Sequence, residues 1–145
     1  MSIFGVYGVK NASQVIYFGL HGLQHRGQEG AGIATFDGGE CHHHRGLGLA
    51  GKVFQHEEIQ KLPGSLGIGS TQYANKAKGG LDNVKPLFFH HKSGDFAIAG
   101  EGSLVNSRQI SEYLEDRGII FHTATDSELL ANPIKKDGAE DRIFH

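Results

Sequence analysis

Glycine is the residue type that most restricts what this chain can fold into, because 22 of its 145 residues are glycines. Glycines inside apolar stretches predict strands that a second backbone approaches closely, and glycines between such stretches predict tight turns. Residues 3–8 (IFGVYG) are of the first kind and predict a short buried strand. Residues 37–39 (DGG) are of the second kind and predict the turn of a β-hairpin between strands at 31–36 and 40–45.

Apolar periodicity and turn residues predict the remaining elements. Residues 11–24 begin with the helix-start residue Asn11 and carry an apolar stripe, so they predict a helix of about three turns that Gly27 can close. A second hairpin is expected from strands at 87–91 and 96–99. The other expected elements are a short helix at 57–62, a strand at 66–73, an exposed loop at 75–83, a helix starting at Asn106, a strand at 119–122 and a last helix starting at Asp126 or Ser127. This set predicts an α+β protein with mainly antiparallel pairing.

Charge and cysteine content exclude several functional classes. The net charge is -2 with neutral histidines, so the chain has no basic field to hold a nucleic acid or an anionic membrane. No apolar run reaches the roughly 20 residues that span a bilayer, and the N-terminus lacks the features of a secretion signal. Cys41 is the only cysteine, so an internal disulfide is impossible and we expect a cytoplasmic protein.

Residues 20–34 (LHGLQHRGQEGAGIA) resemble the N-terminal glutaminase domain of amidophosphoribosyltransferase, a class II glutamine amidotransferase of purine synthesis. Further matching strings follow in the same order and spacing as far as about residue 132, at 46–49, 53–54, 62–64, 68–69, 102–106, 118–121 and 125–128. The resemblance implies an N-terminal nucleophile fold, an αββα sandwich in which two antiparallel sheets lie between helix layers. We expect a partial domain at residues 1–134, incomplete at its C-terminal end, and a polar tail at residues 135–145.

The resemblance also implies a chemistry. In this family the nucleophile is a cysteine that begins the mature chain, and its own α-amino group is the base. The released ammonia passes to a phosphoribosyltransferase domain. Such a reaction needs a nucleophile, a base, an oxyanion hole and a clamp on the amino-acid part of glutamine.

The nucleophile and the oxyanion hole of the family are altered in this chain. The family begins Cys-Gly-Ile-Phe-Gly, whereas this chain begins MSIFG, so Met1 stands at the position of the catalytic cysteine. A thioether has no proton to lose and cannot start acyl transfer. Glu101 replaces the asparagine that donates to the oxyanion, and Gly102, the backbone donor, is retained. Cys41 does not compensate, because it lies within a predicted strand and has no free α-amino group.

The clamp on the substrate carboxylate is altered as well. The family pattern Gly-His-Val-Arg-Tyr becomes GSTQY at residues 69–73, so the neutral Gln72 replaces the arginine that would bind the carboxylate. Arg26 and Asp126, the latter expected to hold the α-amino group, are retained.

These departures predict a degenerate domain without glutaminase activity, a pseudoenzyme that needs no cofactor. Its expected role is that of a binding or regulatory module for glutamine or a related small amino acid. A phosphoribosyltransferase subunit or self-association could cover the sheet edges that an incomplete domain leaves open. A remnant of a decayed gene, without a selected function, is a further alternative that the sequence does not separate from these roles.

Two other hypotheses stay open at this point. Removal of the initiator methionine would leave Ser2 as an N-terminal hydroxyl nucleophile, one position late in the alignment, and the chain would then be an active glutamine amidohydrolase supplying ammonia for purine synthesis. A His-rich metal-binding protein is the second, because residues 41–44 (CHHH) and 90–91 (HH) offer ligands. Adjacent strand residues point to opposite faces, so only alternate ones can share a metal, and our expectation is no metal site.

Overall fold

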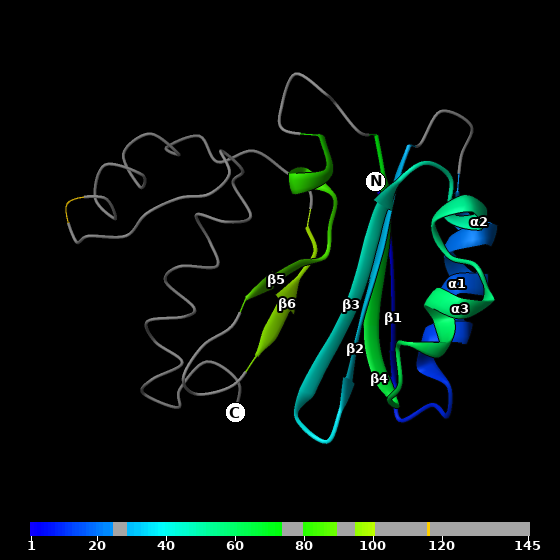
Figure 1. The fold of residues 1–145 in the computed structure, drawn as a ribbon, viewed down its shortest axis with the longest axis vertical. Helices are drawn as coiled ribbons and strands as arrows, with labels where there is room; N and C mark the ends of the chain where they lie inside the picture. The colour runs from blue at the N-terminus through cyan, green and yellow to red at the C-terminus, as the bar shows by residue number, and fades with distance from the viewer. Residues whose placement is uncertain (25–28, 74–79, 90–94, 101–115, 117–145) are drawn as a thin grey trace.

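The computed structural model describes residues 1–24, 29–73, 80–89, 95–100 and 116, and Figure 1 shows their arrangement. The elements in these ranges are β1 (Ser2–Tyr7), α1 (Ala12–Leu23), β2 (Gly30–Asp37), β3 (Glu40–Leu47), α2 (Ala50–Val53), α3 (His56–Gln60), β4 (Leu66–Gln72), the 3-10 helix η2 (Gly80–Asn83), β5 (Leu87–Phe89) and β6 (Phe96–Ile98).

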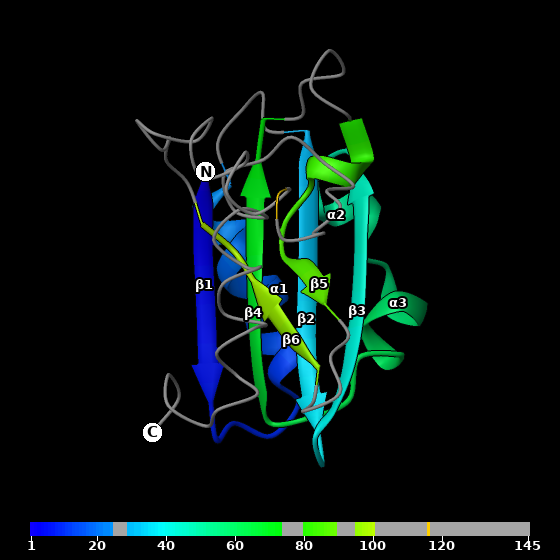
Figure 2. The same ribbon diagram turned by 90° about the vertical axis from the view of Figure 1, so that its left-hand side faces the viewer.

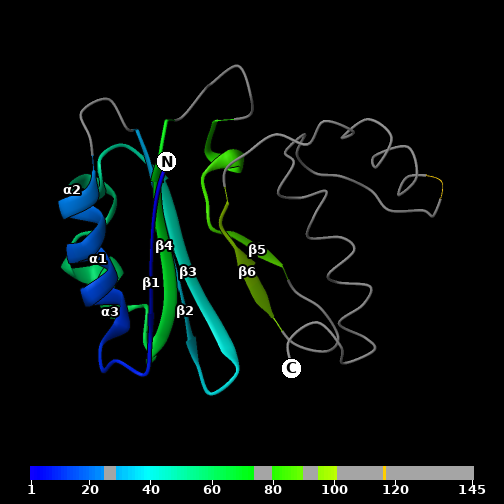
Figure 3. The ribbon, with the colours of Figure 1, turned by 180° about the vertical axis from the view of Figure 1, so that it is seen from behind.

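The described strands form two antiparallel sheets. The larger sheet has the order β1-β4-β2-β3, and β5 pairs with β6 in a second sheet. The three α-helices in the described ranges cover one face of the larger sheet, and the β5–β6 sheet lies over the other face (Figures 1 and 3). Viewed from the side of the smaller sheet, the four long strands lie side by side in the order of their pairing (Figure 2). The α+β class with antiparallel pairing is confirmed.

Glycines in β4 let the main helix approach the sheet closely. Ile16 and Leu20, one turn apart on α1, are fully buried in the core under the helices. A Cβ atom built at Gly69 would overlap Ile16 and lie 2.9 Å from Leu20 Cδ1, and one at Gly67 would lie 2.8 Å from Ile16 Cδ1. The close approach at Gly67 and Gly69 was not predicted.

The prediction of a buried strand with close-approach glycines was made for residues 3–8. It is wrong there, because β1 alternates between half-buried and exposed residues. A Cβ at Gly5 would make only ordinary contacts, and one at Gly8 would meet no atom within 4 Å.

The start of α1 differs from the sequence-based expectation. Asn11 precedes the helix with φ 56° and its side chain makes no capping hydrogen bond. The hydroxyl of Ser13 instead donates to the carbonyl of Ile59, 3.3 Å away, and so joins α1 to α3. The hairpin turn agrees with the expectation, because Gly38 and Gly39 both have positive φ, at 58° and 88°.

Most predicted elements in the described ranges are present, with ends that move by one or two residues. The exposed loop expected at 75–83 is wrong at its end, where residues 80–83 form η2. The four-residue α2 was not predicted, because it is too short to show a period. The helices expected from Asn106 and Asp126 and the strand at 119–122 lie outside the described residues. None of the described helices is long and apolar enough to cross a membrane.

Candidate functional site

Two of the predicted site residues meet at one end of the larger sheet. In the β1–β4 register Ser2 lies opposite Thr71, so continuing that register by one residue places Met1 beside Gln72. Gln72 is in turn the partner of Gly30 in β2. Met1, Gln72 and Gly30 therefore form one row across the end of the sheet where the N-terminus lies (Figure 2).

The side chains of Met1 and Ser2 lie on opposite faces of β1. Phe4 packs against the core under the helices, and Ser2, two residues before it, also points to the helix side, where its Oγ donates to the carbonyl of Leu23 at 3.2 Å. Successive strand side chains alternate between faces, so the alternation places Met1 on the opposite face, toward the smaller sheet. The candidate alternative nucleophile, Ser2, thus lies on the other side of the sheet from Gln72.

Gln72 uses both ends of its carboxamide on the main chain. Its Nε2 donates to the carbonyl of Asn83 at 2.7 Å, and its Oε1 accepts a hydrogen bond from the amide of Lys85 at 3.0 Å. Such a side chain supplies no positive charge for a carboxylate. Gln72 therefore serves as a structural tether.

We call residues 82–85, which run from the end of η2 toward β5, the strap. Arg45 of β3 donates from Nη1 to the carbonyls of Asp82 and Val84, at 3.1 and 2.9 Å. Ser70 of β4 donates from Oγ to the carbonyl of Lys85 at 2.5 Å. Gly32 of β2 leaves the space that the strap fills, because a Cβ there would overlap the Lys85 carbonyl. The strap is thus held by side chains from β3 and β4 and lies directly on β2.

The comparisons with known proteins agree with one another, although no protein-family model matches the chain. The amidophosphoribosyltransferase of Bacillus subtilis (strain 168) is 47% identical over 137 residues, which are 94% of this chain and 29% of that protein. The amidophosphoribosyltransferase of Methanocaldococcus jannaschii is 42% identical over 137 residues, 93% of this chain and 29% of that protein. This chain is a homologue of the N-terminal glutamine amidotransferase domain of amidophosphoribosyltransferase.

Solved structures support the same assignment. The structure of an allosteric regulatory enzyme of purine biosynthesis matches with a TM-score of 0.84 and 44% identity, covering 99% of this chain and 30% of that one. Glutamine phosphoribosylpyrophosphate amidotransferase from B. subtilis, complexed with ADP and GMP, matches with a TM-score of 0.79 and 43% identity. The fold is thus that of the N-terminal domain of amidophosphoribosyltransferase, an N-terminal nucleophile fold. The chain spans about 30% of the length of these relatives.

Four of the residues that the amidophosphoribosyltransferase resemblance singled out, Arg26, Glu101, Gly102 and Asp126, lie outside the described residues. Arg45 and Ser70 were not predicted. Their contacts are with main-chain atoms of a distant segment, and residue type alone does not indicate such partners. Two glycines separated by one residue in β2, Gly30 and Gly32, were the available signal, because they leave that face of the strand open to another backbone.

Cys41 is far from the end of the sheet that carries Met1 and Gln72. It pairs with Phe36, which pairs with Leu66 and through it with Tyr7, so its row crosses β1 at the opposite end from Met1. The two rows are six residue steps apart along β1, from Met1 to Tyr7, which corresponds to roughly 20 Å. Burial and the negative charge of Asp95 raise the pKa of the Cys41 thiol to about 11. At neutral pH this cysteine is protonated and is not a nucleophile.

We expect Cys41 to react slowly with Ellman's reagent in the native protein. A pKa raised from 9.0 to about 11 lowers the thiolate fraction about 100-fold at pH 8, since each pKa unit is a factor of ten. The measurement is the rate of thiol release from native and urea-unfolded protein at pH 8. A native rate within twofold of the unfolded rate would contradict this environment for Cys41.

The histidines of β3 face two ways, as strand alternation predicts. His43 stacks on Phe88 of β5 with ring centroids 4.4 Å apart, whereas Nε2 of His44 lies 3.2 Å from the carbonyl of Val53 on the helix side. His42 is 3.9 Å from the carboxylate of Glu40. Within the described ranges no three His, Cys, Asp or Glu side chains gather as metal ligands, and residues 90–91 lie outside those ranges.

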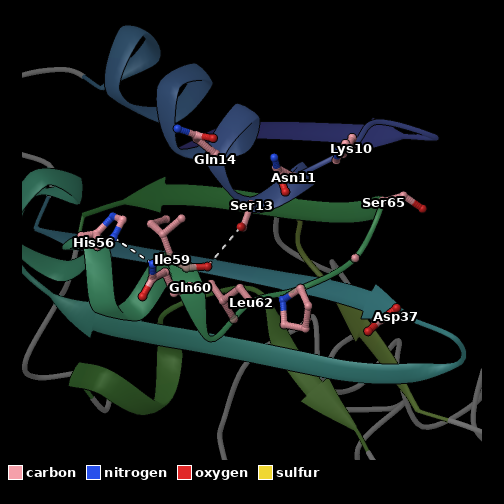
Figure 4. A pocket seen from close by; sticks show the side chains of 12 residues that line it. Lys10, Asn11, Ser13, Gln14, Asp37, His56, Ile59, Gln60, Leu62 and Ser65 are labelled. Atoms are coloured by element: carbon pink, nitrogen blue, oxygen red, sulfur yellow. Dashed lines mark hydrogen bonds between the residues drawn. The ribbon is translucent and has the colours of Figure 1, made fainter.

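A cavity of about 590 Å³ lies between the start of α1 and α3 (Figure 4). It is at the end of the larger sheet opposite the one that carries Met1. Its rim carries Lys10, Asn11 and Gln14 from the α1 side and His56 and Gln60 from α3. Gln60 and His56 are hydrogen-bonded to each other at 2.8 Å. Met1, Ser2 and Gln72, the described residues at the expected amidotransferase positions, do not line this cavity, so it is separate from the row that contains Met1 and Gln72.

Proposed function

We propose that this chain is an amidophosphoribosyltransferase-type glutamine amidotransferase domain without glutaminase activity. The observation that carries the proposal is the environment of Gln72. It stands beside Met1, where the resemblance requires an arginine for the substrate carboxylate, and both of its amide ends are bonded to the strap. A residue so used offers a glutamine ligand neither charge nor a free pair of donors.

The nucleophile position supports the same conclusion. Met1 has a thioether, which cannot be deprotonated and forms no acyl intermediate by the family's route. Ser2 would be the only nearby substitute among the first described residues, but its hydroxyl faces α1 and donates to Leu23. For Ser2 to reach a substrate next to Gln72, β1 would have to turn over and expose Phe4.

The sequence at the oxyanion position adds an electrostatic reason. Glu101 stands where the family has an asparagine donor, and loss of one such donor typically raises the barrier by about 3 kcal/mol. An ionised carboxylate also repels the developing negative charge, so the barrier should rise further. Gly102 alone would remain as a donor.

The role we propose is that of a binding or regulatory module in the cytoplasm. Arg26 and Asp126 keep the residue types that could hold the charged groups of glutamine or a related small amino acid. Because the curated relatives are amidophosphoribosyltransferases, a phosphoribosyltransferase subunit is the partner that the homology favours, and self-association is the alternative.

The proposal predicts that the purified protein does not hydrolyse glutamine. Ammonia release would be measured with the B. subtilis amidophosphoribosyltransferase as a positive control, together with mass spectrometry of the N-terminus. Calorimetric titration with glutamine then tests binding without turnover. Turnover that disappears in Ser2→Ala but survives in Ser13→Ala, a buried serine on the helix side, would overturn the proposal in favour of an active enzyme.

A further inference from the structure

Side chains of β3 and β4 make five hydrogen bonds to main-chain atoms of the strap among the described residues, and three of the five come from β4. Ser70 and Gln72 lie two residues apart in β4 and therefore on one face. They supply the bonds to the Lys85 carbonyl, the Asn83 carbonyl and the Lys85 amide. The other two bonds come from Arg45 on β3 and reach the carbonyls of Asp82 and Val84.

Ser70 and Gln72 meet at a single residue of the strap. Ser70 Oγ donates to the carbonyl of Lys85, and Gln72 Oε1 accepts from the amide of Lys85. When one of these bonds opens, Lys85 is less well oriented for the other, so the two side chains should be energetically coupled. Arg45 binds other peptide groups and approaches from another strand, so it does not replace either bond.

The same two positions are those at which the strap-facing side of β4 departs from the family pattern. GSTQY at residues 69–73 stands where the family has Gly-His-Val-Arg-Tyr, so a serine and a glutamine replace a histidine and an arginine. Both replacements are uncharged, and both side chains hydrogen-bond to main-chain atoms of the strap. Gln72 already uses one of its two Nε2 donors and one lone pair of Oε1 on the strap, so its carboxamide is oriented toward Asn83 and Lys85 and not toward a ligand.

We propose that Ser70 and Gln72 form a latch that closes the strap over the end of the sheet that carries Met1. The contact is autoinhibitory in form, because the side chain at the carboxylate-clamp position is bonded within the protein. The interpretation of position 72 as a former ligand contact rests on the proposed function. The latch itself is a property of the described hydrogen bonds and is tested without glutamine.

Hydrogen exchange of the Lys85 amide, followed by NMR on the full chain, tests the latch. Gln72→Met keeps the length of the side chain without its polar atoms, and we expect it to speed exchange at Lys85 at least tenfold by local opening. Ser70→Ala should have a similar effect in the wild-type background but less than a twofold effect in the Gln72→Met background. Gln72→Glu keeps an acceptor for the Lys85 amide and should restore much of its protection.

The matched control is Gln60→Met, because Gln60 is a glutamine on α3 that is hydrogen-bonded to His56, on the other face of the sheet from the strap. It should leave Lys85 exchange unchanged. Unchanged exchange in a folded Gln72→Met protein, or equal effects of Ser70→Ala in both backgrounds, would overturn the latch. If Gln72→Met fails to fold, Ser70→Ala alone tests the latch: it should speed exchange of the Lys85 amide, and unchanged exchange would overturn the latch. The result is independent of whether the protein hydrolyses glutamine.

Discussion

Ile16→Ala is expected to lower the free energy of unfolding by about 2–5 kcal/mol, the range for truncating a fully buried isoleucine. Ile16 has no exposed surface and faces Gly67 and Gly69 across the helix–sheet contact. Two glycines have no side chains that could move into the space left behind, so the cavity should persist and the loss should fall in the upper half of that range. Urea unfolding followed by circular dichroism measures it.

Phe18→Ala on the same helix is the control, because Phe18 is 64% exposed and its removal leaves no cavity. It should change the free energy of unfolding by less than about 1 kcal/mol. Gly69→Ala supplies the opposite perturbation, since its Cβ would overlap Ile16, and should cost about 1–3 kcal/mol by overpacking. The double variant should be less destabilised than the sum, because the truncated residue 16 makes room for the new methyl group. Additive losses would contradict this account of the packing.

The sequence predicts the buried face of α1 and the β2–β3 hairpin turn well, because both depend on residues that are close together in the chain. The four-residue spacing of Ile16 and Leu20 indicates a buried helix face, and the paired Gly38 and Gly39 indicate the hairpin turn. The start of α1 was predicted less well. Asn11 marks where the helix begins, but its side chain does not cap the helix, and the hydroxyl of Ser13 donates to the carbonyl of Ile59. That bond depends on where α3 packs, which no local pattern contains.

The site was accessible from the sequence only through the family resemblance. Periodicity does not place Met1 beside Gln72, which is 71 positions later in the chain; the β1–β4 register does. The resemblance identified Gln72 as a lost clamp, but it could not show that the amide is bonded to Asn83 and Lys85. Those partners follow from the position of the strap, which depends on the space above Gly30 and Gly32.

Restoring the three altered groups together should restore glutamine hydrolysis. The variant carries Met1→Cys, with cysteine as the first residue of the mature chain, together with Gln72→Arg and Glu101→Asn. It regains a thiol with an α-amino base, a cation for the carboxylate and a donor for the oxyanion. Met1→Cys alone should remain at least 100-fold slower than the triple variant, since one oxyanion donor is worth about 10²–10³ in kcat. Ammonia release and single-turnover acylation measure both.

Gln72→Arg acts in two directions, so folding must be measured alongside activity. The arginine supplies the charge that the carboxylate needs, but it removes the acceptor for the partly buried Lys85 amide, and the loss of that bond costs up to about 3 kcal/mol. The matched control is the same triple variant with Ala in place of the introduced cysteine, which should fold equally and release no ammonia. A folded triple variant that binds no glutamine would show that the defect lies outside these three positions. A single Met1→Cys variant as fast as the triple one would show that Gln72 and Glu101 never impaired the site, and the latch would then have to open whenever glutamine binds.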